Sequence, residues 1–114
     1  MGRRRLMARR LERGEIWLYE FHKPDKRRPV VIISRQEVIE LIDTVMVAPV
    51  RSSIRGAPSE VAVGTEEGLK HESGVSLDHV QTVEKRRLRS YVGRLGPSKM
   101  AAICRALAVA TGCS

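Results

Sequence analysis

The sequence has few of the residues and runs that would place it in several large protein classes. Its only two cysteines, Cys104 and Cys113, have no histidine or further cysteine at the spacing of a metal site, so the reduced thiols of a cytosolic protein are expected. No apolar run approaches the roughly 18 residues of a membrane-spanning helix, and the basic start GRRRLMARRLER lacks the apolar stretch of a secretory signal. We therefore expect a soluble, cytoplasmic chain that contacts no membrane and folds as one domain with a modest core.

The motifs of well-known catalytic and phosphate-binding sites are also missing. The chain contains no Gly-rich phosphate loop, HExxH, CxxC or GxSxG. Its histidines, His22, His71 and His79, are not spaced like metal ligands, and each is expected at the surface or in a local hydrogen bond. His79 follows Asp78 in a predicted strand, where neighbours point to opposite faces, so the two are not expected to form an acid–base pair. The sequence thus predicts no metal and no cofactor.

Positive charge is abundant in the sequence. The formal net charge is +8, but residues 1–13 alone hold six arginines and one glutamate, and the other 101 residues hold 15 cations and 12 anions. Binding of a polyanion by the folded part therefore depends on local clusters rather than on the overall charge. We expect residues 1–12 to be a basic arm that is disordered or was added for expression, and residues 13–114 to be the folded domain. The basic clusters within it are Lys23, Lys26, Arg27 and Arg28; Arg51 and Arg55; and Lys85, Arg86, Arg87 and Arg89.

Short strands separated by turn residues dominate the rest of the sequence. The segment EIWLYEF (15–21) has apolar side chains on both faces, and VVIIS (30–34) is a β-branched run, so both strands are predicted to be covered on two sides. Pro49 is expected to fray or bulge the strand over 44–50. Further strands are predicted over 59–63, over 74–80 with a continuation through 81–83, and over 91–95.

Two segments change to helical spacing. Residues 35–42 predict a short surface helix, and residues 98–110 predict a longer one. The shared face of the short helix consists of Val38, Leu41 and Ile42, and the apolar stripe of the long one consists of Met100, Ile103, Cys104 and Leu107. The expected ends of the long helix are Gly96 as N-cap, Pro97 in the first turn and Gly112 after the last. The sequence thus indicates a mainly β protein with helices, a small antiparallel barrel followed by a C-terminal α-helix.

Two loops at strand ends, 26–28 (KRR) and 51–55 (RSSIR), carry guanidinium groups, and the second also carries hydroxyls. Guanidinium is always charged and binds phosphate through a fork of donors, which suits the charge that builds on a phosphodiester during cleavage. Pro29 restricts Arg28 to extended geometry beside the core strand, so Arg28 is expected to be held better than an ordinary loop arginine. The alternative is that KRR is a solvated loop and that the serines are ordinary turn residues.

The order of several short motifs resembles that of the MazF/PemK-type toxins of bacterial toxin–antitoxin pairs. The motifs are RGEIW, KRRPVVIIS, VMVAPV…SSIRG, SEVAVG…EGL, SGVSLDHVQTVEKRRL and YVGRL, and together they cover about residues 13–110. The resemblance implies an SH3-like small barrel with a terminal helix, a homodimer, and a metal-independent endoribonuclease that cuts single-stranded RNA (mRNA) at short sequences. It also implies neutralisation by a cognate antitoxin whose largely acidic tail lies over the RNA site. A basic structural protein, such as a small ribosomal component, would fit the charge but not these ordered motifs.

The resemblance assigns roles to particular positions. Arg28 matches the arginine before proline that the family uses in cleavage, and Arg51 stands where the family has a threonine. Ser52 or Ser53 is expected to supply the catalytic hydroxyl instead, with Ser53 on the correct side because side chains alternate along an extended chain. Arg51 leaves two alternatives open: it is an inactivating change, or the chain is a non-catalytic module that binds RNA or an antitoxin through the same cationic groove.

Recognition of single-stranded RNA depends on hydrogen bonds to the bases and on stacking. The candidate RNA-binding residues are Lys26, Arg27, Arg51, Arg55, Ser73 and Gln81. Trp17 and Tyr19 are candidates for stacking, although Trp17 is expected rather in the core or at a dimer contact. With only four aromatic residues in the chain, hydrogen bonding and shape are expected to carry most of the discrimination.

Overall fold

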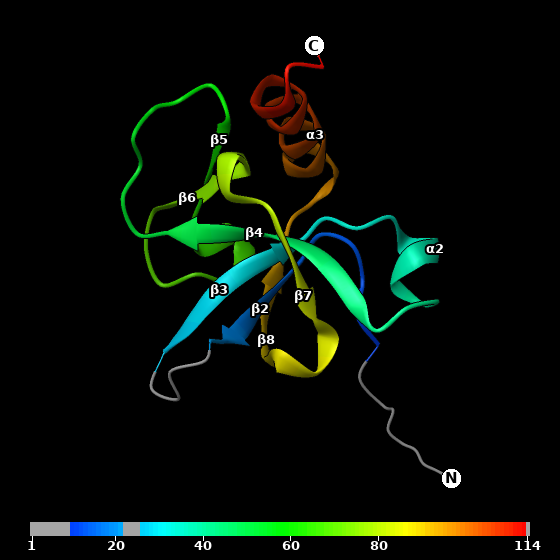
Figure 1. Cartoon of the computed structure of the whole chain (residues 1–114). Helices are drawn as coiled ribbons and strands as arrows, with labels where there is room; N and C mark the ends of the chain where they lie inside the picture. The colour runs from blue at the N-terminus through cyan, green and yellow to red at the C-terminus, as the bar shows by residue number, and fades with distance from the viewer. Residues whose placement is uncertain (1–9, 22–25, 114) are drawn as a thin grey trace, which may run out of the picture.

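The computed structural model describes residues 10–21 and 26–113, which form a strongly bent antiparallel sheet with one long helix beside it (Figure 1). The strands are β2 (Glu15–Glu20), β3 (Arg27–Ile32), β4 (Thr44–Arg51), β5 (Glu60–Val63), β6 (Ser73–Ser76), β7 (Gln81–Glu84) and β8 (Leu88–Arg94). The helices are α2 (Gln36–Ile39) and α3 (Pro97–Thr111), and the 3₁₀ turns are η1 (Thr65–Glu67), η2 (Leu77–His79) and η3 (Lys85–Arg87). The predicted class, mainly β and barrel-like with a C-terminal α-helix, is confirmed.

The sheet bends at β4. The strand order is β5-β6-β4-β3-β2-β8, and β7 also pairs with β4. On one side β4 pairs with β3, and on the other it pairs with β7 over residues 44–47 and with β6 over residues 50–51. The Met46 carbonyl accepts a hydrogen bond from Ile33 on the β3 side, so Pro49, three residues on, turns its nitrogen to the other side, between the β7 and β6 segments. Its missing N–H interrupts no ladder there. The strand continues past it, and the expectation of fraying or a bulge was wrong.

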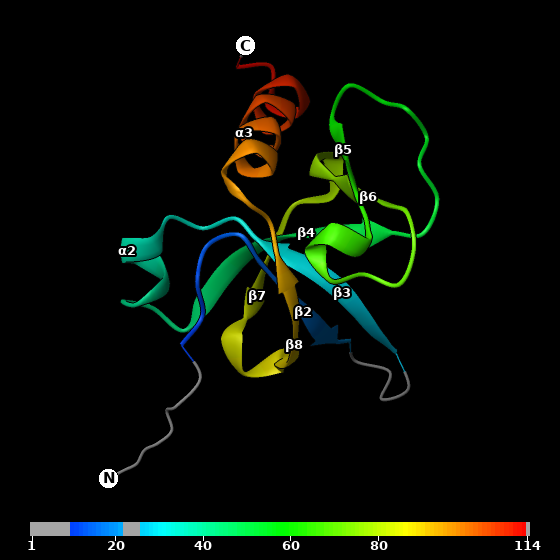
Figure 2. The ribbon, with the colours of Figure 1, turned by 180° about the vertical axis from the view of Figure 1, so that it is seen from behind.

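Alternation along β2, β3 and β4 supplies two apolar cores on opposite faces of the sheet. The first core includes Ile16, Val31 and Ala48 together with Val61, Val75, Leu77, Leu95, Ile103 and Ala106. The second core includes Trp17, Val30 and Val47 together with Leu11, Tyr19, Ile32, Ile39, Val45, Val83 and Leu88. The prediction that β2 and β3 are covered on both sides is therefore confirmed. Seen from behind, α3 stands beside β5 and β6, and α2 lies at the far end of β4 (Figure 2).

The helix α3 has the predicted caps and extends one residue beyond the predicted range of 98–110 at each end. Gly96 is the N-cap, Pro97 follows it, and Gly112 ends the helix with a left-handed φ of 74°. Ile103 and Ala106 are its buried residues, facing the first core. The predicted apolar stripe was wrong in one residue. Cys104 is exposed. Ile103 and Ala106 are three positions apart and define the side of the helix that faces β5 and η2, so the Cys104 thiol lies beside that face, in solvent.

The helix α2 is shorter than predicted, and its buried side differs. It comprises four residues, so Leu41 and Ile42 lie beyond its end, and Ile39 is the side chain that enters the second core. Val38, Leu41 and Ile42 are exposed, which corrects the predicted face. Arg10 pairs with Glu40 at 2.9 Å beside this helix, and hydrogen bonds from Arg10 and then Gln36 lower the pKa of that carboxyl.

The strand predicted over 74–80 is interrupted. It ends at Ser76, and the turn η2 redirects the chain before β7 begins, so the single long strand was wrong while the segment at 81–83 is confirmed. In this turn Asp78 accepts a hydrogen bond from Ser59, and His79 Nδ1 lies 2.8 Å from Ser76 Oγ. The two side chains thus have separate partners.

Some expectations fall on residues outside the described part. They concern His22, Lys23 and most of the predicted basic arm. Of that arm, Arg10 to Glu12 are described, and Leu11 packs in the second core. The boundary between arm and domain stays a prediction. No helix in the described ranges is long and apolar enough to cross a membrane.

Candidate functional site

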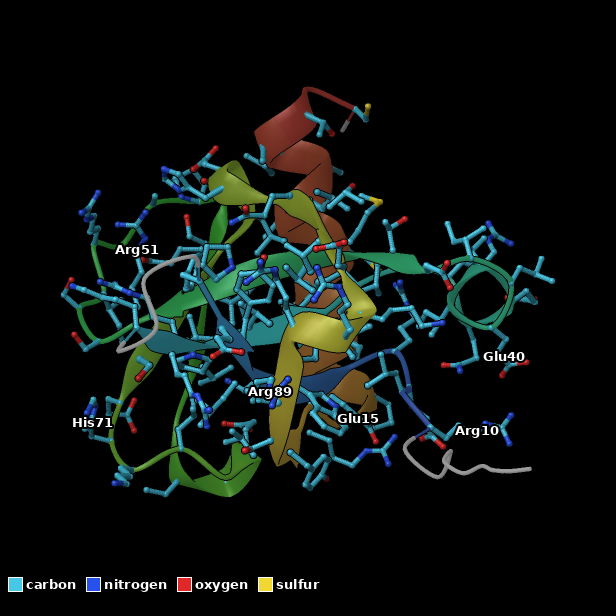
Figure 3. The ribbon with its side chains drawn as sticks, turned by 60° about the horizontal axis from the view of Figure 1, so that its bottom comes forward. Arg10, Glu15, Glu40, Arg51, His71 and Arg89 are labelled. Atoms are coloured by element: carbon cyan, nitrogen blue, oxygen red, sulfur yellow. The ribbon has the colours of Figure 1, made fainter. Side chains whose placement is uncertain are left out.

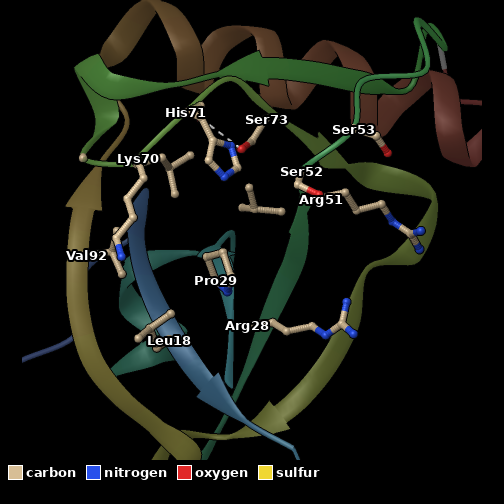
Figure 4. A pocket seen from close by; sticks show the side chains of 13 residues that line it. Leu18, Arg28, Pro29, Arg51, Ser52, Ser53, Lys70, His71, Ser73 and Val92 are labelled. Atoms are coloured by element: carbon tan, nitrogen blue, oxygen red, sulfur yellow. Dashed lines mark hydrogen bonds between the residues drawn. The ribbon is translucent and has the colours of Figure 1, made fainter. Parts of the chain in front are cut away.

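A pocket of about 620 Å³ opens where β3 begins, where β4 ends and where the chain leads from η1 into β6 (Figure 4). Its apolar lining consists of Leu18, Pro29, Val50, Leu69 and Val92. Leu18 pairs with Pro29, two residues along the strands from the Ile16–Val31 pair of the first core. Side chains two residues apart in a strand point to the same face, so the pocket lies over the same face of the sheet as that core. The polar side chains around it are Arg28, Arg51, Ser52, Ser53, Lys70, His71 and Ser73.

Strand register brings Arg28 and Arg51 together. The β3–β4 ladder ends at the pair of Val30 with Pro49, so Arg28, near the start of β3, and Arg51, at the end of β4, both lie two residues beyond the last pair. Strand alternation turns both side chains away from the face of Pro29 and Val50, so they lie at the edge of the pocket, and in Figure 4 the two guanidinium groups extend toward the same side, away from His71. The two basic loops that are distant in sequence therefore line one pocket, as the sequence interpretation requires.

Neither guanidinium has an acidic partner in the part of the chain that the structure describes. The Arg28 side chain is exposed and forms no hydrogen bond or ion pair there, and Arg51 Nε is buried without a hydrogen-bond partner. The cluster near η3 differs, since Arg87 pairs with Glu84 and Arg89 pairs with Glu20. Figure 3 shows Arg51 and His71 on the side of the molecule opposite to the Arg10–Glu40 pair.

Both serines after Arg51 line the pocket. The sequence argument assigned only Ser53 to the correct side by strand alternation, but β4 ends at Arg51 and alternation does not extend into the loop. Glu60 shapes this loop, because its Oε1 accepts hydrogen bonds from the backbone N–H groups of Arg55 at 2.9 Å and Gly56 at 2.8 Å. The loop therefore has a fixed anchor on β5.

The wall opposite the arginines rests on glycine contacts. Gly68 follows η1 with φ 98°, and a side chain there would meet the Val92 carbonyl at 2.5 Å. A Cβ on Gly93 of β8 would lie 1.9 Å from the Glu67 carbonyl. Glu67 itself is buried and accepts a hydrogen bond from the Gly64 N–H at 2.7 Å. The turn that leads to Lys70 and His71 is thus packed backbone to backbone against β8.

The other predicted RNA-binding residues are placed outside the pocket. Lys26 and Arg27 are exposed before and at the start of β3, Arg55 is exposed in the loop before β5, and Gln81 is exposed on β7 opposite Val47. Their roles stay predictions. Ser73 lines the pocket but is buried, and its Oγ donates to the His71 carbonyl at 3.1 Å.

The aromatic candidates for base stacking lie inside the protein. Trp17 is 4% exposed and donates through Nε1 to Glu15, and Tyr19 packs edge-on against Phe21. Their rings belong to the second core, on the other face of the sheet from the pocket.

The sequence interpretation missed Lys70 and His71. They lie in the turn-rich segment TEEGLKHE, and only the packing of that turn against β8 brings them to the pocket. The one sequence signal that could have identified them is a lysine–histidine pair just before a buried strand. Within the described ranges no three His, Cys, Asp or Glu side chains are grouped as a metal site would require.

Comparison with known proteins assigns the family. Residues 12–111 match the PemK-like, MazF-like toxin of type II toxin–antitoxin systems. The chain belongs to this family. The resemblance found in the ordered motifs is thereby confirmed.

Individual relatives are similar over almost their whole length. The chain is 41% identical over 103 residues to the probable endoribonuclease MazF5 of Mycobacterium tuberculosis, covering 90% of this chain and 94% of that protein. The solved toxin MazF-mt6 of Mycobacterium tuberculosis superposes with a TM-score of 0.80 at 33% identity, covering 88% of this chain and 98% of the other. An endoribonuclease from a mycobacterial species, solved in complex with its cognate antitoxin, gives a TM-score of 0.82 at 26% identity, covering 91% and 97%.

Proposed function

We propose that this chain is a metal-independent endoribonuclease toxin that cuts single-stranded RNA, including mRNA, in the cytoplasm. The observation that carries the proposal is the pair of guanidinium groups, Arg28 and Arg51, which line one pocket without an acidic partner among the described residues. Like charges on neighbouring strands repel each other, whereas an anion between them forms charge-assisted bonds with both. A phosphodiester is such an anion, and the relatives named as endoribonucleases supply the class of reaction.

In the proposed reaction the 2′-oxygen of one nucleotide attacks the adjacent phosphorus and displaces the 5′-oxygen of the next nucleotide. Negative charge grows on the non-bridging oxygens during this step. Guanidinium groups aimed at those oxygens stabilise the transition state, and arginine does so as a donor of hydrogen bonds because it hardly releases its proton at neutral pH. Ser52 and Ser53 add hydroxyl donors from the adjacent loop. The products are a 2′,3′-cyclic phosphate and a 5′-hydroxyl end.

Arg51 takes a binding role in this proposal. A long cation in place of the family's threonine grips the phosphate, while the serines that follow supply the hydroxyl. The exposed Lys26, Arg27, Arg55 and Gln81 would contact RNA on either side of the scissile phosphate. A chain that binds RNA without cutting it is the competing outcome.

The proposed partners are an antitoxin and a second copy of the chain. An acidic antitoxin segment that covers the pocket would neutralise the same unpaired cations that hold RNA, so RNA and antitoxin would exclude each other. A homodimer is proposed from the family resemblance, and light scattering of the purified chain measures it directly.

Cleavage of a long single-stranded RNA in EDTA tests the function. Discrete cuts with 2′,3′-cyclic phosphate ends are expected from the unaltered chain. Arg28→Ala should slow cutting by about 10²–10³-fold, the usual effect of removing one transition-state donor. Arg86→Ala is the matched control, because Arg86 is 72% exposed and pairs with Glu84 away from the pocket. Intact RNA, or equal rates for Arg28→Ala and the unaltered chain, would contradict the proposal.

A further inference from the structure

Attack by a 2′-hydroxyl requires a group that accepts its proton, and most polar side chains of the pocket cannot serve. Arginine and lysine side chains stay protonated at neutral pH, and serine hydroxyls are very weak bases. Imidazole is the side chain that ordinarily exchanges a proton between pH 5 and 8. Among the described residues that line the pocket, His71 alone carries such a group.

The His71 ring is placed to use this property. It is exposed, and Figure 4 shows it projecting into the pocket from the segment between η1 and β6, across from Pro29 and Arg28. Its Nδ1 lies 3.3 Å from the Glu72 carbonyl oxygen. When Nδ1–H donates to that oxygen, Nε2 keeps its lone pair and becomes the proton acceptor. A substrate in the pocket would therefore meet the basic nitrogen.

The backbone beneath the ring is held from two directions. Ser73, which is 4% exposed, donates its hydroxyl to the His71 carbonyl at 3.1 Å. The preceding turn packs against β8 through Gly68 and Gly93, whose Cβ positions are blocked by backbone atoms. The ring therefore stands on an anchored backbone, and proton transfer in the transition state requires a base whose position is fixed.

We infer that His71 is a catalytic residue of this pocket, the base that takes the proton from the 2′-hydroxyl of bound RNA. The inference rests on the proposed function. As the O–H proton moves to Nε2, the 2′-oxygen bonds to phosphorus and the bond from phosphorus to the 5′-oxygen breaks. The leaving 5′-oxygen takes a proton from water, and the imidazolium returns its own proton to the hydroxide that remains. No further reactant is consumed.

The other charged side chains that line the pocket come from three segments. Arg28 projects from β3, Arg51 from the end of β4, and Lys70 precedes His71 in the chain. The Glu72 carboxylate lies over Gly64, beside the turn rather than in the pocket. Since arginine and lysine side chains keep their charge between pH 5 and 8, an inflection of rate in that range reports the imidazole.

Single-turnover cleavage of RNA between pH 5 and 8 tests the inference, with affinity measured on the same RNA carrying 2′-O-methyl groups that cannot be cut. His71→Gln should slow cleavage by about 100-fold or more and lose the pH inflection, while affinity stays unchanged. Added imidazole should restore part of the rate to His71→Ala. His79→Gln is the matched control, because His79 is also exposed but contacts Ser76 outside the pocket.

The outcomes separate the two proposals. Full-rate cleavage by His71→Gln overturns the role of His71 and leaves the endoribonuclease standing. The role of His71 as base is also overturned if rate and affinity fall together and imidazole restores nothing to His71→Ala, since the ring would then only bind RNA. If the unaltered chain binds RNA and leaves it whole over the entire pH range, both the cleavage and its base are overturned.

Discussion

Substitution of Gly93 by alanine tests how the pocket wall is built. A Cβ on Gly93 would lie 1.9 Å from the Glu67 carbonyl oxygen, 2.8 Å from its carbon and 3.1 Å from the Gly68 Cα. All three are backbone atoms of the turn η1 and its end, so no flexible side chain can swing away. Gly93 does not have a positive φ, and the effect of the added methyl group is therefore steric alone.

The size of the effect follows from this geometry. The distance from the new Cβ to the Glu67 carbonyl oxygen must grow from 1.9 Å to more than 3.0 Å, because Cβ atoms in proteins essentially never have closer contacts. The turn and β8 must therefore move apart. Overpacking of this kind costs about 1–3 kcal/mol of the free energy of unfolding. For a domain of this length that lowers Tm by roughly 4–15 °C. Because the displaced turn carries Lys70 and His71, the affinity of the pocket for single-stranded RNA should fall as well.

Thermal unfolding followed by circular dichroism measures the change. Gly96→Ala is the matched control, because a Cβ there meets nothing within 4 Å and its φ of −77° suits any residue. As an N-cap change it should cost about 1 kcal/mol or less. A Gly93→Ala variant that melts with the unaltered chain would refute the backbone-to-backbone packing of η1 on β8.

Three further substitutions address the loop, the second core and the phosphate grip. Glu60→Gln keeps the size of the side chain but weakens the acceptor for the Arg55 and Gly56 N–H groups, so the loop at 52–57 should gain faster amide hydrogen exchange while β5 stays protected. Ile39→Ala should lower the free energy of unfolding by about 2–5 kcal/mol in denaturant titration, because Ile39 is 2% exposed in the second core; a loss within error of zero would contradict that packing. Arg51→Lys keeps the charge and removes the fork, so RNA affinity should weaken with little change in its salt dependence, and unchanged affinity would rule out a forked contact.

The relation between sequence and structure differs from one element to the next. The helix α3 was predictable with its ends, because Gly96, Pro97 and Gly112 are local signals that depend on backbone conformation alone. The short helix α2 was predictable as an element, but its buried face was not. A single turn is too short for its own periodicity to define a face, and the packing of Ile39 in the second core decides it. The expected fraying or bulge at Pro49 was wrong for a related reason. Its cost depends on which neighbour β4 has at that residue, and the neighbour changes there from β7 to β6.

The sequence by itself determined the mainly β class, the strands that are covered on both faces, the terminal helix, the family and the arginine before Pro29. These depend on periodicity, on backbone preference and on the order of short motifs, all of which a linear chain carries. Only the tertiary structure decided which basic residues share a pocket. Pairing of β3 with β4 brings the start of β3, with Arg28, beside the end of β4, with Arg51, while Arg87 and Arg89 pair with acidic residues. The contact of Gly93 with the turn after β5 adds His71 to that pocket, because proximity across a bent sheet is fixed by strand register and packing.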